Sequence, residues 1–104
     1  MGYYTKHELE VQQGSNDLIE ELRESCEGAN YAIKSNGDPR VKCKWHDHSK
    51  DMKVFSALHP HALFKLSGEG EDAEDLWREY HKNGKVQVCK AVIAYPQFNS
   101  YSLV

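Results

Sequence analysis

The stretch LWREYHKNGKVQVCKAVIAY, residues 76–95, decides the fold. Asn83-Gly84 lies at its centre, and an Asn-Gly pair between two strand-patterned runs is the strongest short-range signal for a β-hairpin. We therefore expect one strand over Leu76–His81 and a second over Lys85–Tyr95. Pro96 should end the second strand, because proline has no N–H group to donate to a sheet.

Three further strands are predicted upstream of the hairpin from the alternation of apolar and polar residues. They cover Tyr3–Val11, Val41–Trp45 and His61–Ser67. The middle strand would place Val, Cys and Trp inside and basic residues outside, as in a half-buried sheet.

Two helices are predicted between these strands from apolar residues that recur every three or four positions. The first runs from Asp17 to a stop at Gly28, and the second starts at Asp47 or Ser49 and ends at His59. The predicted order is β-α-β-α-β-β-β. This is an α+β fold with two helices packed on a mostly antiparallel sheet, a variant of the ferredoxin-like arrangement.

Length and composition fit one domain, residues 1–104, with 97–104 as a C-terminal tail. The longest apolar run, Ala91–Tyr95, is far shorter than the ~20 residues of a membrane-spanning helix. The three cysteines, Cys26, Cys43 and Cys89, lack any paired spacing. We therefore expect free thiols, buried as small apolar side chains, in a cytoplasmic protein.

Acidic residues are concentrated after the predicted third strand, with five carboxylates in residues 69–75. Such a segment can dock on a basic protein surface and steer association, and aromatic residues beside it can anchor an interface. We therefore predict a partner-binding site made of Glu69, Glu71, Asp72, Glu74, Asp75, Trp77 and Tyr80. The alternative is a solvated loop whose charge aids solubility.

A zinc-binding protein is a second interpretation, because cysteine and histidine are the ligands that zinc prefers. The candidate ligands are Cys43, His46, His48, His59 and His61. They lack the paired CxxC or HxxxH spacings of zinc motifs, so surface histidines at helix ends are favoured instead. We expect no metal and no other cofactor.

A nucleic-acid-binding module is a third interpretation, based on a basic region over residues 34–65. Its cations are Lys34, Arg40, Lys42, Lys44, Lys50, Lys53 and Lys65. The net charge of −3 argues against a dedicated nucleic-acid binder, and Trp45 is in phase with the predicted core rather than with a stacking surface. No nucleophile elbow, phosphate-binding loop or dinucleotide-binding motif is present, so we expect no enzymatic activity.

A set of residues at the expected ends of helices and strands resembles the pattern of small phage- and plasmid-encoded proteins with a YubB-type ferredoxin-like domain. These are Trp45, Asp51, Ser56-x-x-His59-Pro60-x-x-x-Phe64, Gly68-Glu69-Gly70-Glu71 and Asn83-Gly84-Lys85. The resemblance covers about 40 residues, implies a ferredoxin-like fold and a viral or mobile-element origin, and supplies no catalytic residue.

The resulting hypothesis is a small, non-enzymatic accessory protein that binds and modulates a host macromolecule, with inhibition of a nuclease-based host defence as one concrete form. A homodimer is also expected. Beyond Lys90 the last strand is apolar on both faces and must be covered, either by the tail residues Phe98, Tyr101 and Leu103 or by a second copy packed through Val92.

Overall fold

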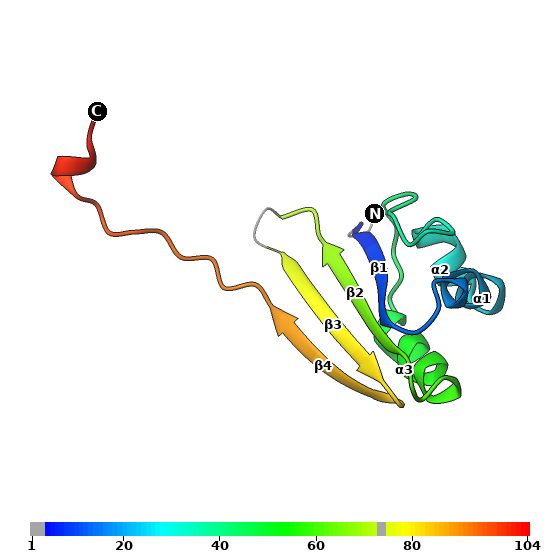
Figure 1. Ribbon diagram of the computed structural model, residues 1–104. Helices are drawn as coiled ribbons and strands as arrows, with labels where there is room; N and C mark the ends of the chain where they lie inside the picture. Colours follow the sequence, from blue (N-terminus) through cyan, green and yellow to red (C-terminus); the bar gives the residue numbers. More distant parts are fainter. Residues whose placement is uncertain (1–3, 73–74) are drawn as a thin grey trace.

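The computed structural model describes residues 4–72 and 75–104, and these form an α+β fold in two layers (Figure 1). One layer is an antiparallel sheet of β1 (Lys6–Gln13), β2 (Leu63–Glu69), β3 (Leu76–Lys82) and β4 (Lys85–Lys90). The other layer holds α1 (Asp17–Ser25), α2 (Glu27–Ala32) and α3 (His48–Leu58). A short 3-10 turn, η1 (Ser100–Ser102), lies near the C-terminus.

The predicted α+β class is confirmed, but the predicted element order is not. The described order is β-α-α-α-β-β-β, and the four strands are neighbours in chain order, β1-β2-β3-β4. A ferredoxin-like arrangement is therefore not confirmed. The first predicted helix is split at Cys26, and Gly28 lies within α2 instead of stopping a helix. A side chain at Gly28 would overlap the indole of Trp45, so the position serves packing rather than termination.

The Asn83-Gly84 hairpin is confirmed as predicted. Asn83 and Gly84 have φ values of 50° and 76°, the left-handed pair that a two-residue turn requires, and Lys82 pairs with Lys85 across it. The prediction of a strand as far as Tyr95 is wrong, because β4 ends at Lys90. The reason is the length of β3: its first residue, Leu76, accepts a hydrogen bond from Ala91 (2.9 Å), and no strand residue remains beyond it to pair with.

The predicted strand over Val41–Trp45 is also wrong. Residues 37–43 run beside β1 but form only a bridge between Thr5 and Cys43, together with one hydrogen bond from Leu9 N–H to Gly37 O (2.9 Å). Gly37 has φ +90° and Pro39 has no N–H group, so the chain cannot keep a regular ladder here. Val41 is consequently exposed, whereas Trp45 is buried as expected.

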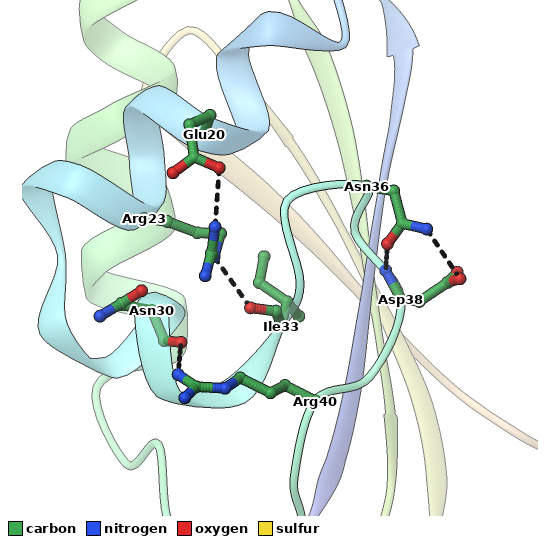
Figure 2. A network of polar contacts seen from close by, with 7 residues as sticks. All are labelled: Glu20, Arg23, Asn30, Ile33, Asn36, Asp38 and Arg40. Atoms are coloured by element: carbon green, nitrogen blue, oxygen red, sulfur yellow. Dashed lines mark hydrogen bonds and ion pairs between the residues drawn. The ribbon is translucent and has the colours of Figure 1, made fainter.

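Polar contacts hold the preceding loop, residues 33–40, and attach it to the helices (Figure 2). Arg23 donates to Ile33 O (3.0 Å) and pairs with Glu20 (2.7 Å), and Arg40 donates to Asn30 O (3.0 Å). Asn36 and Asp38 hold the turn between them through two bonds of 3.0 Å. The result is a fixed loop that covers the outer edge of β1.

The core lies between the helices and one face of the sheet. His7 and Leu9 of β1, Phe64 and Leu66 of β2, and the side chains of α1 to α3 that face them are buried. The Cys26 and Cys43 side chains are only half-buried, at the rim of this core, and Cys89 is half-buried on the opposite face of the sheet. No helix in the described part of the chain is long and apolar enough to cross a membrane.

Candidate functional site

The predicted acidic site lies at the turn between β2 and β3. Glu69, Glu71 and Asp72 are exposed, and the turn is closed by hydrogen bonds from Gly70 N–H to Asp75 O (2.8 Å) and from Asp75 N–H to Asp72 O (3.0 Å). Glu71 accepts a bond from the Tyr4 N–H (3.1 Å). Glu74 lies outside the described residues. We call Glu69, Glu71, Asp72 and Asp75 the acidic turn.

The two aromatic residues of the predicted site lie on opposite faces of β3. Trp77 faces the helices, packs over Gly68 and stacks on His48 with ring centroids 4.5 Å apart. Tyr80 alternates with it and faces away from the helices. The structure therefore does not bring Trp77 and Tyr80 together on one surface.

The candidate zinc ligands are dispersed. His48 binds Glu79 (3.1 Å), His59 binds Glu21 (3.1 Å), and Cys43 lies 4.0 Å from His7. His46 and His61 are exposed. Residues 4–72 and 75–104 contain no group of three or more potential ligands that could hold a metal ion.

The cations of the basic region are also spread over several elements. Lys65 lies on β2 and pairs with Glu10 (2.9 Å), whereas Lys50 and Lys53 lie on α3. Arg40 lies near the Tyr31 ring, 6.0 Å from its centroid, and the Lys44 ammonium lies 5.3 Å from the Tyr4 centroid. The structure offers no single basic face formed by this whole set.

A buried polar network that the sequence did not reveal links β1, α3 and β3. Glu79 accepts from His48 (3.1 Å) and from His81 (2.9 Å) through the same oxygen, Oε1. The ring of His7 lies 6.0 Å from that of His48 and makes edge contacts with Trp45 and Trp77. His81 is fully buried, and its Nδ1 has no hydrogen-bond partner among the described residues.

Burial and neighbouring charges shift the pKa values in this network. Desolvation and the nearby His48 lower the pKa of His7 to about 4, against smaller upward effects of Glu79 and of a hydrogen bond with the Thr5 backbone. Burial alone would raise the pKa of Glu79, but hydrogen bonds and charges from His48 and His81 outweigh it and hold the pKa at about 2. Burial raises the pKa of the Cys43 thiol. The network therefore favours a neutral His7, a neutral Cys43 thiol and an ionised Glu79 near neutral pH.

The face of the sheet away from the helices is open and polar. A shallow hollow of about 520 Å³ lies over it, with a lining that includes Lys6, Glu8, Lys65, Ser67, Arg78 and Cys89. Ion pairs across neighbouring strands, Lys65 with Glu10 (2.9 Å) and Lys6 with Glu69 (4.0 Å), balance part of its charge. Such a face is stable in water, so it does not itself require a cover.

The C-terminal segment, residues 91–104, is the most unusual surface of the chain. It leaves the end of β4 as an extended coil and projects away from both layers (Figure 1). It contains no Asp, Glu, Lys, Arg or His. Its large apolar side chains are exposed, among them Val92 at 92%, Tyr95 at 81%, Phe98 at 80% and Tyr101 at 95%.

Sequence reasoning identified the apolar residues of this segment but placed them as a cover for the sheet or as a strand. The absence of charge over fourteen residues is the signal that distinguishes the segment from the rest of a chain with 28% charged residues. In contrast, no sequence pattern indicated that His7, His48, Glu79 and His81 would meet, because the pairing of β1 with β2 and of β2 with β3 is a long-range property.

Comparisons with known proteins give no relative. No family model, no curated protein and no solved structure matches this chain. The resemblance to YubB-type proteins is therefore an expectation without support from these comparisons, and the function must be argued from the geometry.

Proposed function

We propose that this chain is a small, non-enzymatic protein-binding protein whose contact surface is the C-terminal segment together with the acidic turn. The observation that carries the proposal is the exposure of Val92, Ile93, Tyr95, Phe98, Tyr101, Leu103 and Val104 on an uncharged, extended segment. Soluble proteins rarely expose contiguous apolar surface on this scale unless it binds something.

The exposed aromatic residues of the segment indicate that the partner surface should be apolar. Tyr95, Phe98 and Tyr101 are each at least 80% exposed, and each can bury roughly 150–250 Å² when it enters a pocket. Aromatic side chains are also the usual energetic anchors of protein interfaces. The partner should therefore offer an apolar groove that accepts an extended peptide.

The acidic turn indicates the charge that the partner surface should carry. It lies at the base of the C-terminal segment, because Leu76, next to the turn, is hydrogen-bonded to Ala91, where the segment begins. Carboxylates at the rim of an interface mainly raise the association rate and select partners of opposite charge. The groove should therefore be flanked by basic residues.

A nuclease of a host defence system is the narrower form of this proposal. Nucleases hold nucleic acid in basic clefts, and an acidic turn beside an apolar segment is complementary to such a rim. The expected viral or mobile-element origin belongs to this narrower form and has no further support.

The test compares three forms of the tagged protein in pull-downs from cells of its own host, with quantitative mass spectrometry. The first form is the full chain, and the second ends at Pro96. The third carries Glu69→Gln, Glu71→Gln, Asp72→Asn and Asp75→Asn. We expect a protein that is enriched by the full chain, lost with the shortened form, and weakened by the neutralised turn.

Two results would decide against parts of the proposal. If the form that ends at Pro96 captures the same protein with the same yield, residues 97–104 are not the contact surface. If only the neutralised form loses the protein, the acidic turn alone carries the binding, as the sequence first suggested.

A further inference from the structure

The two outer edges of the sheet differ in whether another part of the chain covers them. The edge of β1 is covered by the segment 37–43, through the Thr5–Cys43 bridge and the bond from Leu9 to Gly37. Within the described residues, no backbone hydrogen bond reaches the outer edge of β4. An uncovered edge strand is a template for pairing with another chain.

The hydrogen-bonding groups on this open edge can be assigned from the hairpin register. Lys85 pairs with Lys82 across a two-residue turn, and Ala91 donates to Leu76, so odd-numbered residues of the strand point their N–H and C=O groups toward β3. Even-numbered residues therefore point theirs outward. Within β4 the outward set is Val86, Val88 and Lys90. When pairing extends the strand beyond Lys90, the same alternation adds Val92 and Ala94, and Pro96 ends it because it has no N–H group.

We infer that two copies of the chain pair antiparallel through this edge, with residues 86–94 of each strand forming one continuous sheet of two domains. This inference goes beyond the proposed function, since it assigns residues 86–94, Val92 and Ile93 included, to a second copy and leaves the aromatic residues of the C-terminal segment to the partner. A second copy can pair with this edge because the strand is complementary to itself. When two identical strands pair antiparallel about a two-fold axis, the outward N–H groups of each strand meet the outward C=O groups of the other.

The register is restricted by charge. A two-fold axis at Lys90 would place two lysines directly opposite each other, which destabilises a strand pair. An axis at Ala91 pairs Lys90 with Val92 and Val88 with Ala94, and it loses one bond where Val86 faces Pro96. The register centred on Ala91 is therefore the one we infer. It also places the two Ala91 side chains in a non-hydrogen-bonded pair, the closest approach between strands.

The area agrees with a modest dimer. The half-exposed Val88 and the exposed Val92 and Ile93 lie on the paired region. With the backbone between them they would bury on the order of 600 Å² per copy, close to the lower end of specific interfaces. The dimer should therefore form in the micromolar range and dissociate on dilution.

Analytical ultracentrifugation at protein concentrations from about 5 to 500 µM tests the dimer. This range lies within the ~1 µM–1 mM dissociation constants of modest complexes. We expect the wild type and the form that ends at Pro96 to shift from monomer to dimer, because both keep residues 86–94. Val92→Pro should remain monomeric, since it removes an outward donor at a residue that is 92% exposed and costs the domain no internal bond. A wild type that is monomeric throughout, or a Val92→Pro variant that dimerises like the wild type, would overturn the inference.

Cysteine cross-linking tests the register. In a Cys89→Ser background, Ala91→Cys should form a covalent dimer on mild oxidation, because the two introduced thiols would face each other at the axis. Gln97→Cys, the matched control, should not, because residue 97 would face Lys85. Equal cross-linking of the two variants would contradict the register. If Ala91→Cys does not cross-link although the protein still dimerises, the two-fold axis does not lie at Ala91.

The dimer also affects the proposed function. It would present two copies of residues 97–104, which raises the apparent affinity for a partner with two grooves. The two proposals fail separately: a full chain that dimerises but captures no protein removes the function, and a full chain that captures a protein but stays monomeric removes the dimer.

Discussion

At the scale of single residues, the protein is distinguished by the ionisable groups that it buries. His7 is 1% exposed and Glu79 is 4% exposed, and both lie between the sheet and α3. The ring of His7 lies against the rings of His48, Trp45 and Trp77. Glu79 accepts hydrogen bonds from His48 and His81. We interpret this network as a structural one, because two aromatic rings and the helices shield it from solvent.

His7 should make the protein less stable in mild acid. Its pKa is about 4 in the folded protein and 6.5 when unfolded, so the unfolded chain takes up the proton first as the pH falls. The free energy of unfolding should therefore decrease between pH 6.5 and 4, by up to roughly 3 kcal/mol. Glu79 adds a further loss between pH 4.5 and 2, because its folded pKa is lowered.

Urea unfolding at a series of pH values measures this effect. His7→Phe keeps an aromatic ring beside Trp45 and Trp77 but cannot titrate, so most of the pH dependence between 6.5 and 4 should disappear. A variant with the same slope as the wild type would show that His7 is not the responsible group.

Gly68 is a second residue whose identity is fixed by a neighbour. A Cβ atom there would overlap the indole atoms Cε2 and Cζ2 of Trp77, so Trp77 would have to leave its stack on His48. We expect Gly68→Ala to lower the free energy of unfolding by about 1–3 kcal/mol. Ser67→Ala, on the other face of the same strand, is the control and should change it by less than about 0.5 kcal/mol. Equal effects of the two substitutions would contradict the packing described for Trp77.

At the scale of secondary-structure elements, the local turn signal was reliable, whereas strand patterns that depend on a neighbouring strand were not. The Asn83-Gly84 turn is encoded by two residues that tolerate positive φ, so the hairpin could be predicted with its register. The alternation over Val41–Trp45 predicted a strand that Gly37 and Pro39 prevent, because a ladder needs a neighbour as well as a pattern. The end of β4 was missed for the same reason, since it depends on where β3 begins.

The hairpin is attached to α3 through one buried hydroxyl. Ser56 is fully buried and accepts a hydrogen bond from the Gly84 N–H (2.9 Å), while its own hydroxyl donates to Lys53 O (3.0 Å). Ser56→Ala leaves the Gly84 N–H without this acceptor and should cost about 1–3 kcal/mol in the free energy of unfolding. Thermal and urea unfolding measure it. Ser56→Thr, which keeps a hydroxyl, should recover part of the loss unless its extra methyl group does not fit. Unchanged stability of Ser56→Ala would mean that the hairpin is held by its other contacts with α3.

At the scale of the whole molecule, the chain divides into a folded part and an appended segment. The layers are complete by Lys90, and the large apolar side chains beyond it contribute little to the core (Figure 1). The acidic part of the candidate site could be read from the sequence, because five carboxylates in seven residues are rarely buried. The position of the C-terminal segment could not, because the sequence does not show that the open sheet face is polar enough to remain uncovered.

Removal of residues 92–104 should therefore leave the domain intact. At low micromolar concentration, a chain that ends at Ala91 keeps the Ala91 bond to Leu76 and should have a free energy of unfolding within about 0.5 kcal/mol of the full chain. Circular dichroism with urea unfolding measures this difference. A loss of several kcal/mol would show that the segment packs on its own domain.

The central claim is that residues 91–104 act as a contact surface and are not part of the core. Residue-resolved amide hydrogen exchange at low and at high protein concentration tests it most directly. We predict rapid exchange of residues 92–104 at the low concentration, and protection of Val88, Lys90, Val92 and Ala94 at the high concentration, while residues 97–104 still exchange rapidly. Protection of residues 92–104 at both concentrations would contradict the account, because the segment would then be folded onto its own domain.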